Sequence, residues 1–173
     1  MRLFFALEPA RETALQIADW RDRQFPASTA RPVPIANLHI TLAFVGELPP
    51  PRLERLLQLV DEWRDRPRSA SLHMDCTGYW QRPGIYWLGP REWPQQLEKL
   101  ARRLGAISGQ VGGRQEKRRF QPHVTLFRGC REAPPQPAQE PSYVFAYHHF
   151  TLFESRQGKR GVSYYRLADW GLQ

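Results

Sequence analysis

The stretch NLHITLAFVGE (residues 37–47) alternates apolar and polar side chains, which is the pattern of a half-buried β-strand. Successive side chains of a strand point to opposite faces, so His39 and Thr41 are expected to share one face. The opposite, apolar face is expected to carry Leu38, Ile40, Leu42 and Phe44. The stretch therefore predicts a strand that buries one side and presents an imidazole and a hydroxyl on the other.

A second stretch, PHVTLFR (residues 122–128), repeats this arrangement. His123 and Thr125 share one face, and the buried face holds Val124 and Leu126. Residues i and i+2 of a strand lie roughly 6.6 Å apart, so an imidazole and a hydroxyl at this spacing can reach different oxygens of one phosphate. We predict that the two His/Thr pairs bracket a single phosphate group.

Strand and helix patterns surround both motifs in the same order. The predicted elements are a strand at 2–7, a helix from about 9 to 25, a strand at 37–45, a helix from about 50 to 66, a strand at 70–74, a hairpin that turns at 82–84, a helix from about 94, and strands at 122–128, 142–154 and 162–167. Strand, helix, strand occurs twice. This predicts an α+β fold of two similar lobes, whose antiparallel sheets face a central cleft, within one domain spanning 1–173.

His149 and Thr151 form a third pair at the same spacing. Each of the first two histidines is predicted on the strand that follows an amphipathic helix, so a two-fold arrangement places them opposite one another. His149 follows a proline-rich connection and has no counterpart of this kind. The catalytic pair is therefore expected to be His39 and His123, and the role of His149 stays open.

Several stretches together carry a family resemblance: RLFFALEP (2–9), NLHITLAFVGE (37–47), IYWLG (85–89), PHVTLFR (122–128) and FTLFES (150–155). On these stretches the chain resembles the 2H phosphoesterases, and within them the bacterial 2'-5' RNA ligase type of RNA 2',3'-cyclic phosphodiesterase. The resemblance implies hydrolysis of RNA 2',3'-cyclic phosphate ends or cyclic nucleotides without metal or cofactor, and possible joining of RNA ends through a 2'-5' linkage.

The same resemblance implies a role for each site residue. His39 would be the acid that protonates the ribose O3', His123 would be the base, and a 2'-phosphate end would result. Thr41, Thr125 and Arg128, which lies three residues beyond the second threonine, would bind the substrate phosphate. The chemistry of the residues agrees with these roles, because an imidazole can give or take a proton near neutral pH and each such transfer is worth roughly 10²- to 10⁴-fold in rate.

The charge of the chain agrees with an anionic partner. Lys and Arg total 25 against 17 Asp and Glu, which gives a formal net charge of +8. One basic run, containing Arg114, Lys117, Arg118 and Arg119, directly precedes the second motif. It is predicted either to draw RNA phosphates to the site or to be an ordinary solvated loop. Phe5, Trp80 and Phe120 are candidates for base stacking, with packing in the core as the competing explanation.

Several classes of protein are excluded or disfavoured. Cys76 and Cys130 are far apart and lack a C-x-x-C partner, so neither a disulfide framework nor a zinc ribbon is expected. The apolar run after Arg2 stops at Glu8, too short for a signal peptide or a membrane span. We therefore expect a cytoplasmic monomer with no membrane partner.

Two alternatives to the enzyme remain open. The first is a non-catalytic module that binds RNA ends or nucleotides and uses both histidines only to hold phosphate. The second is a metal site formed by His39, His123 and His149, against which stands the absence of an H-E-x-x-H motif or of clustered carboxylates. Turnover of a cyclic phosphate and sensitivity to a chelator distinguish these alternatives from the enzyme.

Overall fold

The computed structural model describes residues 2–173. Its helices are α1 (Arg11–Gln24), α2 (Pro50–Glu62) and α3 (Gln95–Gln110), with a short 3-10 helix at Ile35–Asn37. Its strands are β1 (Arg2–Leu7), β2 (Arg31–Pro32), β3 (Ile40–Glu47), β4 (Ala70–Met74), β5 (Cys76–Trp80), β6 (Ile85–Gly89), β7 (Val124–Arg128), β8 (Tyr143–Tyr147), β9 (His149–Gly158) and β10 (Gly161–Gly171). No helix of this described part is long and apolar enough to cross a bilayer.

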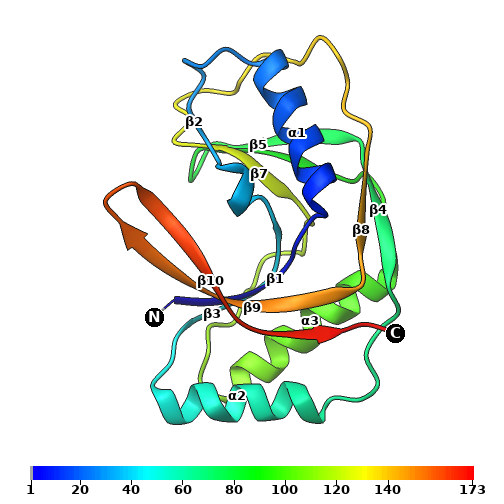
Figure 1. The fold of residues 1–173 in the computed structure, drawn as a ribbon, viewed down its shortest axis with the longest axis vertical. Coiled ribbons are helices and arrows are strands. Elements are labelled where there is room, and N and C mark those ends of the chain that lie inside the picture. Colours follow the sequence, from blue (N-terminus) through cyan, green and yellow to red (C-terminus); the bar gives the residue numbers. More distant parts are fainter. Residues whose placement is uncertain (1) are drawn as a thin grey trace.

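The strands form one long antiparallel sheet and one small one (Figure 1). The long sheet has the order β10-β9-β1-β3-β7-β6-β5, with β2 beside β7, and the small sheet pairs β4 with β8. The two halves of the long sheet meet between β3 and β7, where Ile40 pairs with Val124. These are the residues that follow the two motif histidines. The predicted α+β class with two antiparallel halves is confirmed, and the halves are joined at the two motifs.

Helices cover the two halves from opposite ends of the molecule (Figure 1). Helix α3 packs on β3, and α2 packs on α3. The end of α1 packs on the other half, where the Phe25 ring lies 5.3 Å from Tyr86 and 5.7 Å from Phe127. The sequence pattern suggested that each motif strand packs against the helix that precedes it in the chain. In the structure α1 instead covers the half that contains β7, and α3 covers β3.

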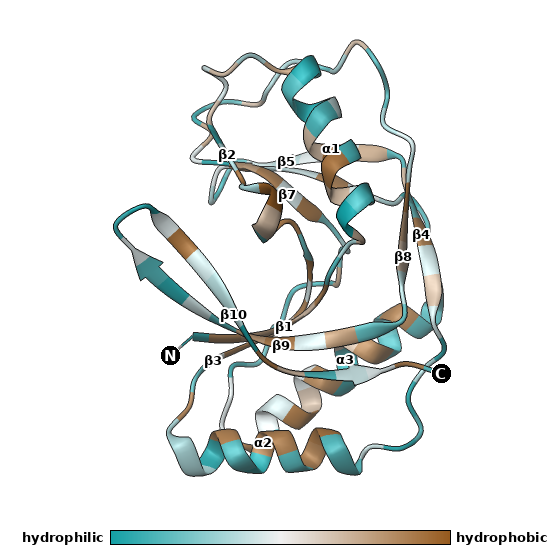
Figure 2. Ribbon diagram, viewed as in Figure 1, coloured by the Kyte–Doolittle hydropathy of each residue, from teal (hydrophilic) through white to brown (hydrophobic). Residues whose placement is uncertain are grey.

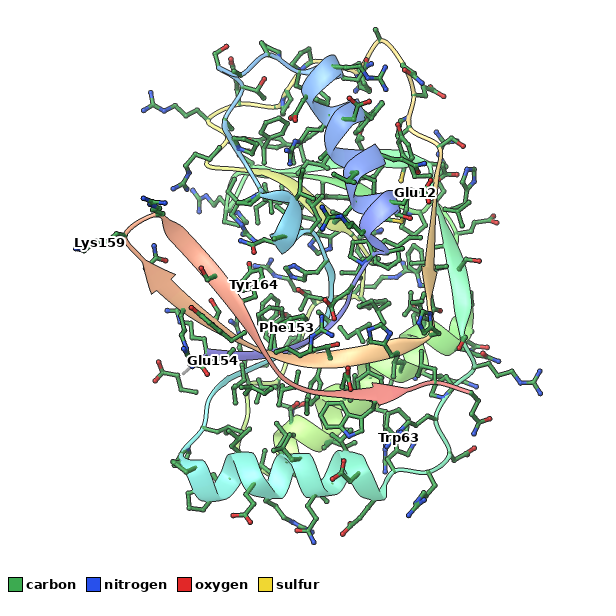
Figure 3. All side chains as sticks on the ribbon, viewed as in Figure 1. Glu12, Trp63, Phe153, Glu154, Lys159 and Tyr164 are labelled. Atoms are coloured by element: carbon green, nitrogen blue, oxygen red, sulfur yellow. The ribbon has the colours of Figure 1, made fainter. Side chains whose placement is uncertain are left out.

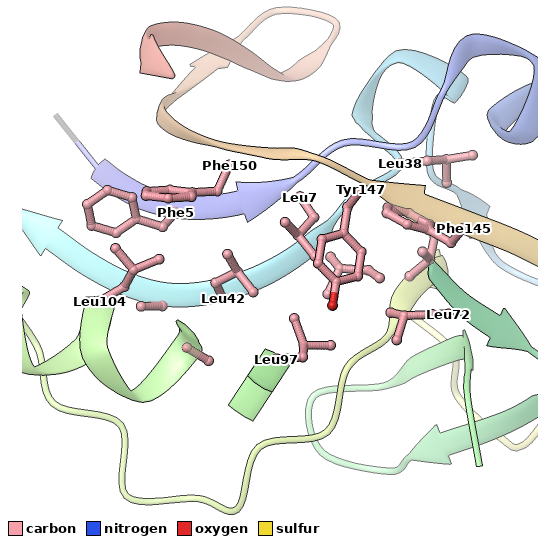
Figure 4. Close-up of a cluster of buried hydrophobic side chains, with 14 of the residues drawn as sticks. Phe5, Leu7, Leu38, Leu42, Leu72, Leu97, Leu104, Phe145, Tyr147 and Phe150 are labelled. Atoms are coloured by element: carbon pink, nitrogen blue, oxygen red, sulfur yellow. The ribbon is translucent and has the colours of Figure 1, made fainter. Parts of the chain in front are cut away.

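The core lies between the sheet and these helices. Hydrophobic and hydrophilic residues alternate along α2 and α3 (Figure 2), and Figure 4 shows how buried side chains of the sheet and of a helix meet. Leu97, Leu100 and Leu104 follow helical spacing on α3 and are fully or almost fully buried. Burying such a side chain stabilises the fold by about 1.5 to 3 kcal/mol relative to leaving it exposed. Phe5 is completely buried in this core, so of the two explanations offered for it, packing in the core is the one the structure supports.

The alternation predicted for residues 37–47 breaks at Leu42. Thr41 pairs with Ala6 of β1, but Ala43 pairs with Phe5, so β3 has one extra residue between these pairs. Such a bulge reverses which side chains face the core. Phe44 was predicted to be buried and is instead 48% exposed, because it lies beside Phe4 on the face that carries the histidine.

The long strand predicted at 142–154 is two strands. The chain leaves the ladder at His148, which separates β8 from β9. Strand β8 pairs with β4 in the small sheet, whereas β9 pairs with β1 and β10 in the long sheet. The continuous apolar pattern hides this change of partner.

Candidate active site

The ring of His39 is held by two hydrogen bonds. Its Nδ1 lies 2.7 Å from the backbone carbonyl oxygen of Asn37, and its Nε2 lies 2.9 Å from Oγ1 of Thr41. A carbonyl oxygen can only accept, so Nδ1 carries the proton and the Thr41 hydroxyl donates to Nε2. The nitrogen that faces Thr41 is therefore an available base in the neutral ring.

His123 is held by an equivalent bond. Its Nδ1 donates to the carbonyl oxygen of Gln121, again two residues earlier and again at 2.7 Å. The neutral ring therefore also has its lone pair on Nε2. The sequence pattern did not identify these two carbonyl groups as ring supports. No residue type signals them, because the backbone and not the side chain of Asn37 or Gln121 makes the bond. Both histidines were predicted within strands, but in the structure each lies one residue before its strand begins.

The Ile40–Val124 pair brings the two motifs together. His39 and Thr41 flank Ile40, and His123 and Thr125 flank Val124. Residues opposite each other in an antiparallel pair lie about 4.5 to 5.5 Å apart between Cα atoms, so this register points Thr41 toward His123 and Thr125 toward His39. Ile40 and Val124 are completely buried, which leaves the four motif side chains on the opposite face.

Burial and neighbouring positive charge favour the neutral form of both rings. Burial lowers the pKa of His39 from 6.5 to about 4; the bond to Asn37 opposes the change, and the charges of Arg128 and His123 add to it. Burial also lowers the pKa of His123, with a further contribution from Arg128 and opposition from the bond to Gln121. Arg128, at the end of β7, is exposed yet near enough for its charge to act on both rings. The structure thus brings all five predicted residues into one neighbourhood.

Aromatic rings cause much of this burial. The centroids of Phe4 and Tyr164 lie 5.1 and 5.2 Å from that of His39, and the Tyr164 and His39 rings are nearly perpendicular. Trp80 and Trp87 lie 4.6 and 6.0 Å from His123. Figure 3 shows Tyr164 on the side of the sheet away from α2 and α3. Of these four, the sequence pattern pointed only to Trp80. The alternation of Phe4 with the buried Phe5 was a signal for Phe4.

The third His/Thr pair has a different environment. Thr151 donates a hydrogen bond of 3.0 Å to the Glu8 carboxylate, and His149 Nε2 lies 3.7 Å from the same oxygen. Arg166 binds the other Glu8 oxygen at 2.6 Å. The pair thus belongs to a polar cluster around Glu8. Glu8 directly follows β1, the strand next to β3. Across residues 2–173, no three His, Cys, Asp or Glu side chains are arranged to hold a metal ion, so the three-histidine alternative lacks its set of ligands.

Comparisons with known proteins agree with this duplicated arrangement. The family model described as LigT like Phosphoesterase matches the chain twice, at residues 6–87 and 88–164, so that the first match contains His39 and Thr41 and the second contains His123 and Thr125. An RNA 2',3'-cyclic phosphodiesterase of Escherichia coli (strain K12) is 37% identical over 171 residues, which cover 99% of this chain and 96% of that protein. A protein of the same name from Thermus thermophilus is 29% identical over 184 residues, with 100% and 91% covered.

Solved structures show the same fold. The crystal structure of E. coli LigT complexed with 3'-AMP superposes with a TM-score of 0.91 at 37% identity and covers 99% of this chain and 97% of that one. The structure of LigT complexed with ATP gives a TM-score of 0.88 at 35% identity, with the same coverage. The duplicated match and the relative that is alike over its whole length lead to one conclusion. The chain belongs to the LigT-like phosphoesterase family.

Proposed function

We propose that this chain is an RNA 2',3'-cyclic phosphodiesterase that opens cyclic phosphate ends to 2'-phosphates by acid–base catalysis with two histidines and no metal. The observation that carries the proposal is the equivalent support of the two rings. Each Nδ1 donates to the carbonyl two residues earlier, so each ring offers Nε2 beside the joint between the two halves of the sheet. The family membership and the name of the E. coli relative support the same activity.

In the proposed reaction, water attacks phosphorus in line with the bond to the ribose O3'. His123 takes a proton from the water through Nε2, and His39 gives a proton from Nε2 to O3' as that bond breaks. The phosphate stays on O2'. Because one group must take a proton while another gives one, the pair needs one neutral and one protonated ring. The assignment of His39 as acid rests on the family resemblance.

The substrate itself supplies the negative charge that favours protonation of a ring. Both ring pKa values are low partly because Arg128 is nearby, and a phosphodiester anion at the same place favours the imidazolium form. Thr41, Thr125 and Arg128 then stabilise the negative charge that grows on the non-bridging oxygens. If the 5'-hydroxyl of a second RNA replaces water as the nucleophile, the same steps form a 2'-5' linkage.

The decisive experiment is incubation with a short RNA that ends in a 2',3'-cyclic phosphate, followed by identification of the product end. We expect a 2'-phosphate, unchanged turnover in EDTA, and loss of nearly all turnover in His39→Ala and in His123→Ala. A 3'-phosphate product would reverse the two roles. Binding without turnover would instead establish the non-catalytic module, and full activity in either variant would contradict the assignment.

The setting of the enzyme is part of the same proposal. Cys76 and Cys130 are both free thiols, which suits a reducing compartment such as the cytoplasm. We also propose that the chain works as a monomer within a single domain, because both motifs come from one chain and meet within it. Size-exclusion chromatography with light scattering tests the monomer, and a dimer of about twice the 20.2 kDa mass would contradict it.

A further inference from the structure

A hollow of about 370 Å³ lies beyond His123, at the end of the β5–β6 hairpin. We call it the arginine hollow; Cys76, Arg91, Trp93, Arg119, Phe120 and Gln121 are among the residues that line it. Arg119 is the last residue of the basic run that precedes the second motif. The hollow takes no part in the reaction described above.

Gln121 connects the arginine hollow to His123. Gln121 lines the hollow and also holds the His123 ring through its carbonyl oxygen. In extended chain these two residues are roughly 6.6 Å apart. The Trp87 indole, which contacts His123, lies flat against Gly78 and Gly89, where any added Cβ would meet the ring. Gly89 in turn pairs with Cys76 of the hollow. An RNA chain that leaves His123 in this direction would reach the hollow beside Gln121.

The charges of the arginine hollow favour an anion. Arg91 and Arg119 are both exposed, and none of the described residues that line the hollow is Asp or Glu. The Cys76 thiol stays uncharged, because burial and Asp75 raise its pKa more than Arg91 lowers it. A neighbouring hollow of about 520 Å³ shares Arg91 and Trp93 but is also lined by Asp75 and Glu92. Phosphate is therefore attracted to the first hollow and repelled by carboxylates in the second.

Two aromatic rings add a surface for a base or a sugar. Trp93 is half-buried, and its indole N–H donates to Glu98 at 3.3 Å, which fixes the ring. Phe120 is also half-buried and packs on the edge of the core. Rings of this kind beside arginines are typical of sites that bind single-stranded nucleic acid, where a base stacks on a ring while a guanidinium holds the backbone.

We propose that the arginine hollow binds the nucleotide immediately upstream of the cyclic phosphate, so that the preferred substrate is the end of an RNA strand and not a cyclic mononucleotide. This inference rests on the proposed function, which places the reacting phosphorus between the two histidines. A strand that ends in a cyclic phosphate continues only on its upstream side, so the next phosphate is the group available to Arg91 and Arg119.

The test compares 2',3'-cyclic CMP with an RNA pentamer that ends in a 2',3'-cyclic phosphate. The variant is Arg91→Gln with Arg119→Gln, two exposed changes. The control is Arg55→Gln with Arg102→Gln on the exposed surfaces of α2 and α3, which removes the same charge elsewhere. For the Arg91→Gln, Arg119→Gln variant we expect kcat/KM on the pentamer to fall by at least tenfold, which corresponds to about 1.4 kcal/mol. Turnover of the mononucleotide should stay within about twofold.

Salt dependence gives a second measurement. The slope of log kcat/KM against log salt for the pentamer should become shallower by about 0.7 for each RNA phosphate that the variant no longer neutralises. Because a base is proposed to stack on Phe120, Phe120→Leu should lower kcat/KM on the pentamer by about 5- to 100-fold and leave kcat/KM on the mononucleotide unchanged. Equal decreases on both substrates, or the same decrease in the control variant, would overturn the proposal.

The arginine hollow can be tested even if the proposed function fails. If the wild-type protein turns over neither substrate, the proposed function is contradicted. Fluorescence anisotropy with a labelled pentamer that ends in a 2'-phosphate then measures binding alone. Weaker binding by the Arg91→Gln, Arg119→Gln variant than by the control variant would support the hollow as an RNA site, and equal binding would contradict it.

Discussion

Between pH 7 and pH 5, the free energy of unfolding of the wild-type protein should fall by about 2 kcal/mol more than that of the His39→Gln variant. Burial is the first cause that lowers the pKa of this ring from 6.5 to about 4. The unfolded chain therefore takes up the proton before the folded chain does. The resulting contribution to stability is complete above about pH 6.5 and is lost as the pH falls toward 4.

The magnitude follows from the two pKa values. A difference of about 2.5 pH units, at about 1.4 kcal/mol per unit, gives about 3 kcal/mol over the whole range, of which roughly 2 kcal/mol falls between pH 7 and pH 5. Glutamine has no charge to take up, so the His39→Gln variant should lose that much less over the same interval. Its absolute stability at pH 7 does not enter the comparison.

Urea denaturation followed by tryptophan fluorescence at several pH values measures this difference. The buffers must contain no phosphate or sulfate, because a bound anion would stabilise the imidazolium and hide the effect. His73→Gln is the matched control, since His73 is exposed on β4. We expect the control to follow the wild-type curve. If the curves of wild type and His39→Gln stay parallel from pH 7 to pH 5, His39 is not buried as a neutral ring and the argument is wrong.

Four further outcomes follow from the same site. The pH profile of kcat/KM should be bell-shaped with its maximum below pH 6.5, because both ring pKa values are lowered; a plateau extending to pH 8 would contradict this. Thr41→Val should reduce kcat/KM by about 10- to 100-fold, because the hydroxyl that contacts His39 Nε2 and is proposed to bind the substrate phosphate is gone. Gly89→Ala should lower activity because its Cβ would lie 2.7 Å from the Pro122 carbonyl, next to His123, whereas Gly105→Ala on α3 meets nothing and should keep full activity. When sulfate binds at pH 7, the protein should take up as much as about one proton per site, which calorimetry in buffers of different ionisation enthalpy measures. Binding without proton uptake would show that the rings stay neutral beside the anion.

The site could be predicted from the sequence to the extent that it depends on local alternation. His39 and Thr41 share a face because a strand repeats every two residues, and the bulge that breaks the pattern comes only after them. Phe44 lies beyond the bulge and was therefore placed wrongly. The bulge depends on how β3 pairs with β1, which residues 37–47 alone do not encode. The ring supports from Asn37 and Gln121 were missed for a related reason, since any residue has a carbonyl group.

Helix placement had the same limit. The spacing of Leu97, Leu100 and Leu104 on α3 correctly predicts that one face of the helix is buried. It does not say which sheet covers that face, because any apolar surface of suitable size satisfies the same pattern. The packing of α3 on β3 and of α1 beside Tyr86 and Phe127 depends on contacts between distant parts of the chain. The two halves of the sequence are therefore similar in pattern, but they do not fold as two separate units.

The same duplication explains how two similar motifs can take opposite roles. Both rings have the same support at Nδ1, so the local chain makes them alike. Their surroundings differ, because Thr41 donates to Nε2 of His39 while Phe4 and Tyr164 enclose that ring. In the proposed mechanism, the lowered pKa values of both rings favour the neutral forms when no anion is bound, and a neutral pair lacks the proton that acid catalysis needs. A bound phosphodiester changes that balance for both rings at once, and the first proton taken up makes the second costlier because the two charges repel. In the proposed mechanism the substrate thus creates one acid and leaves one base, which is the state that in-line cleavage requires.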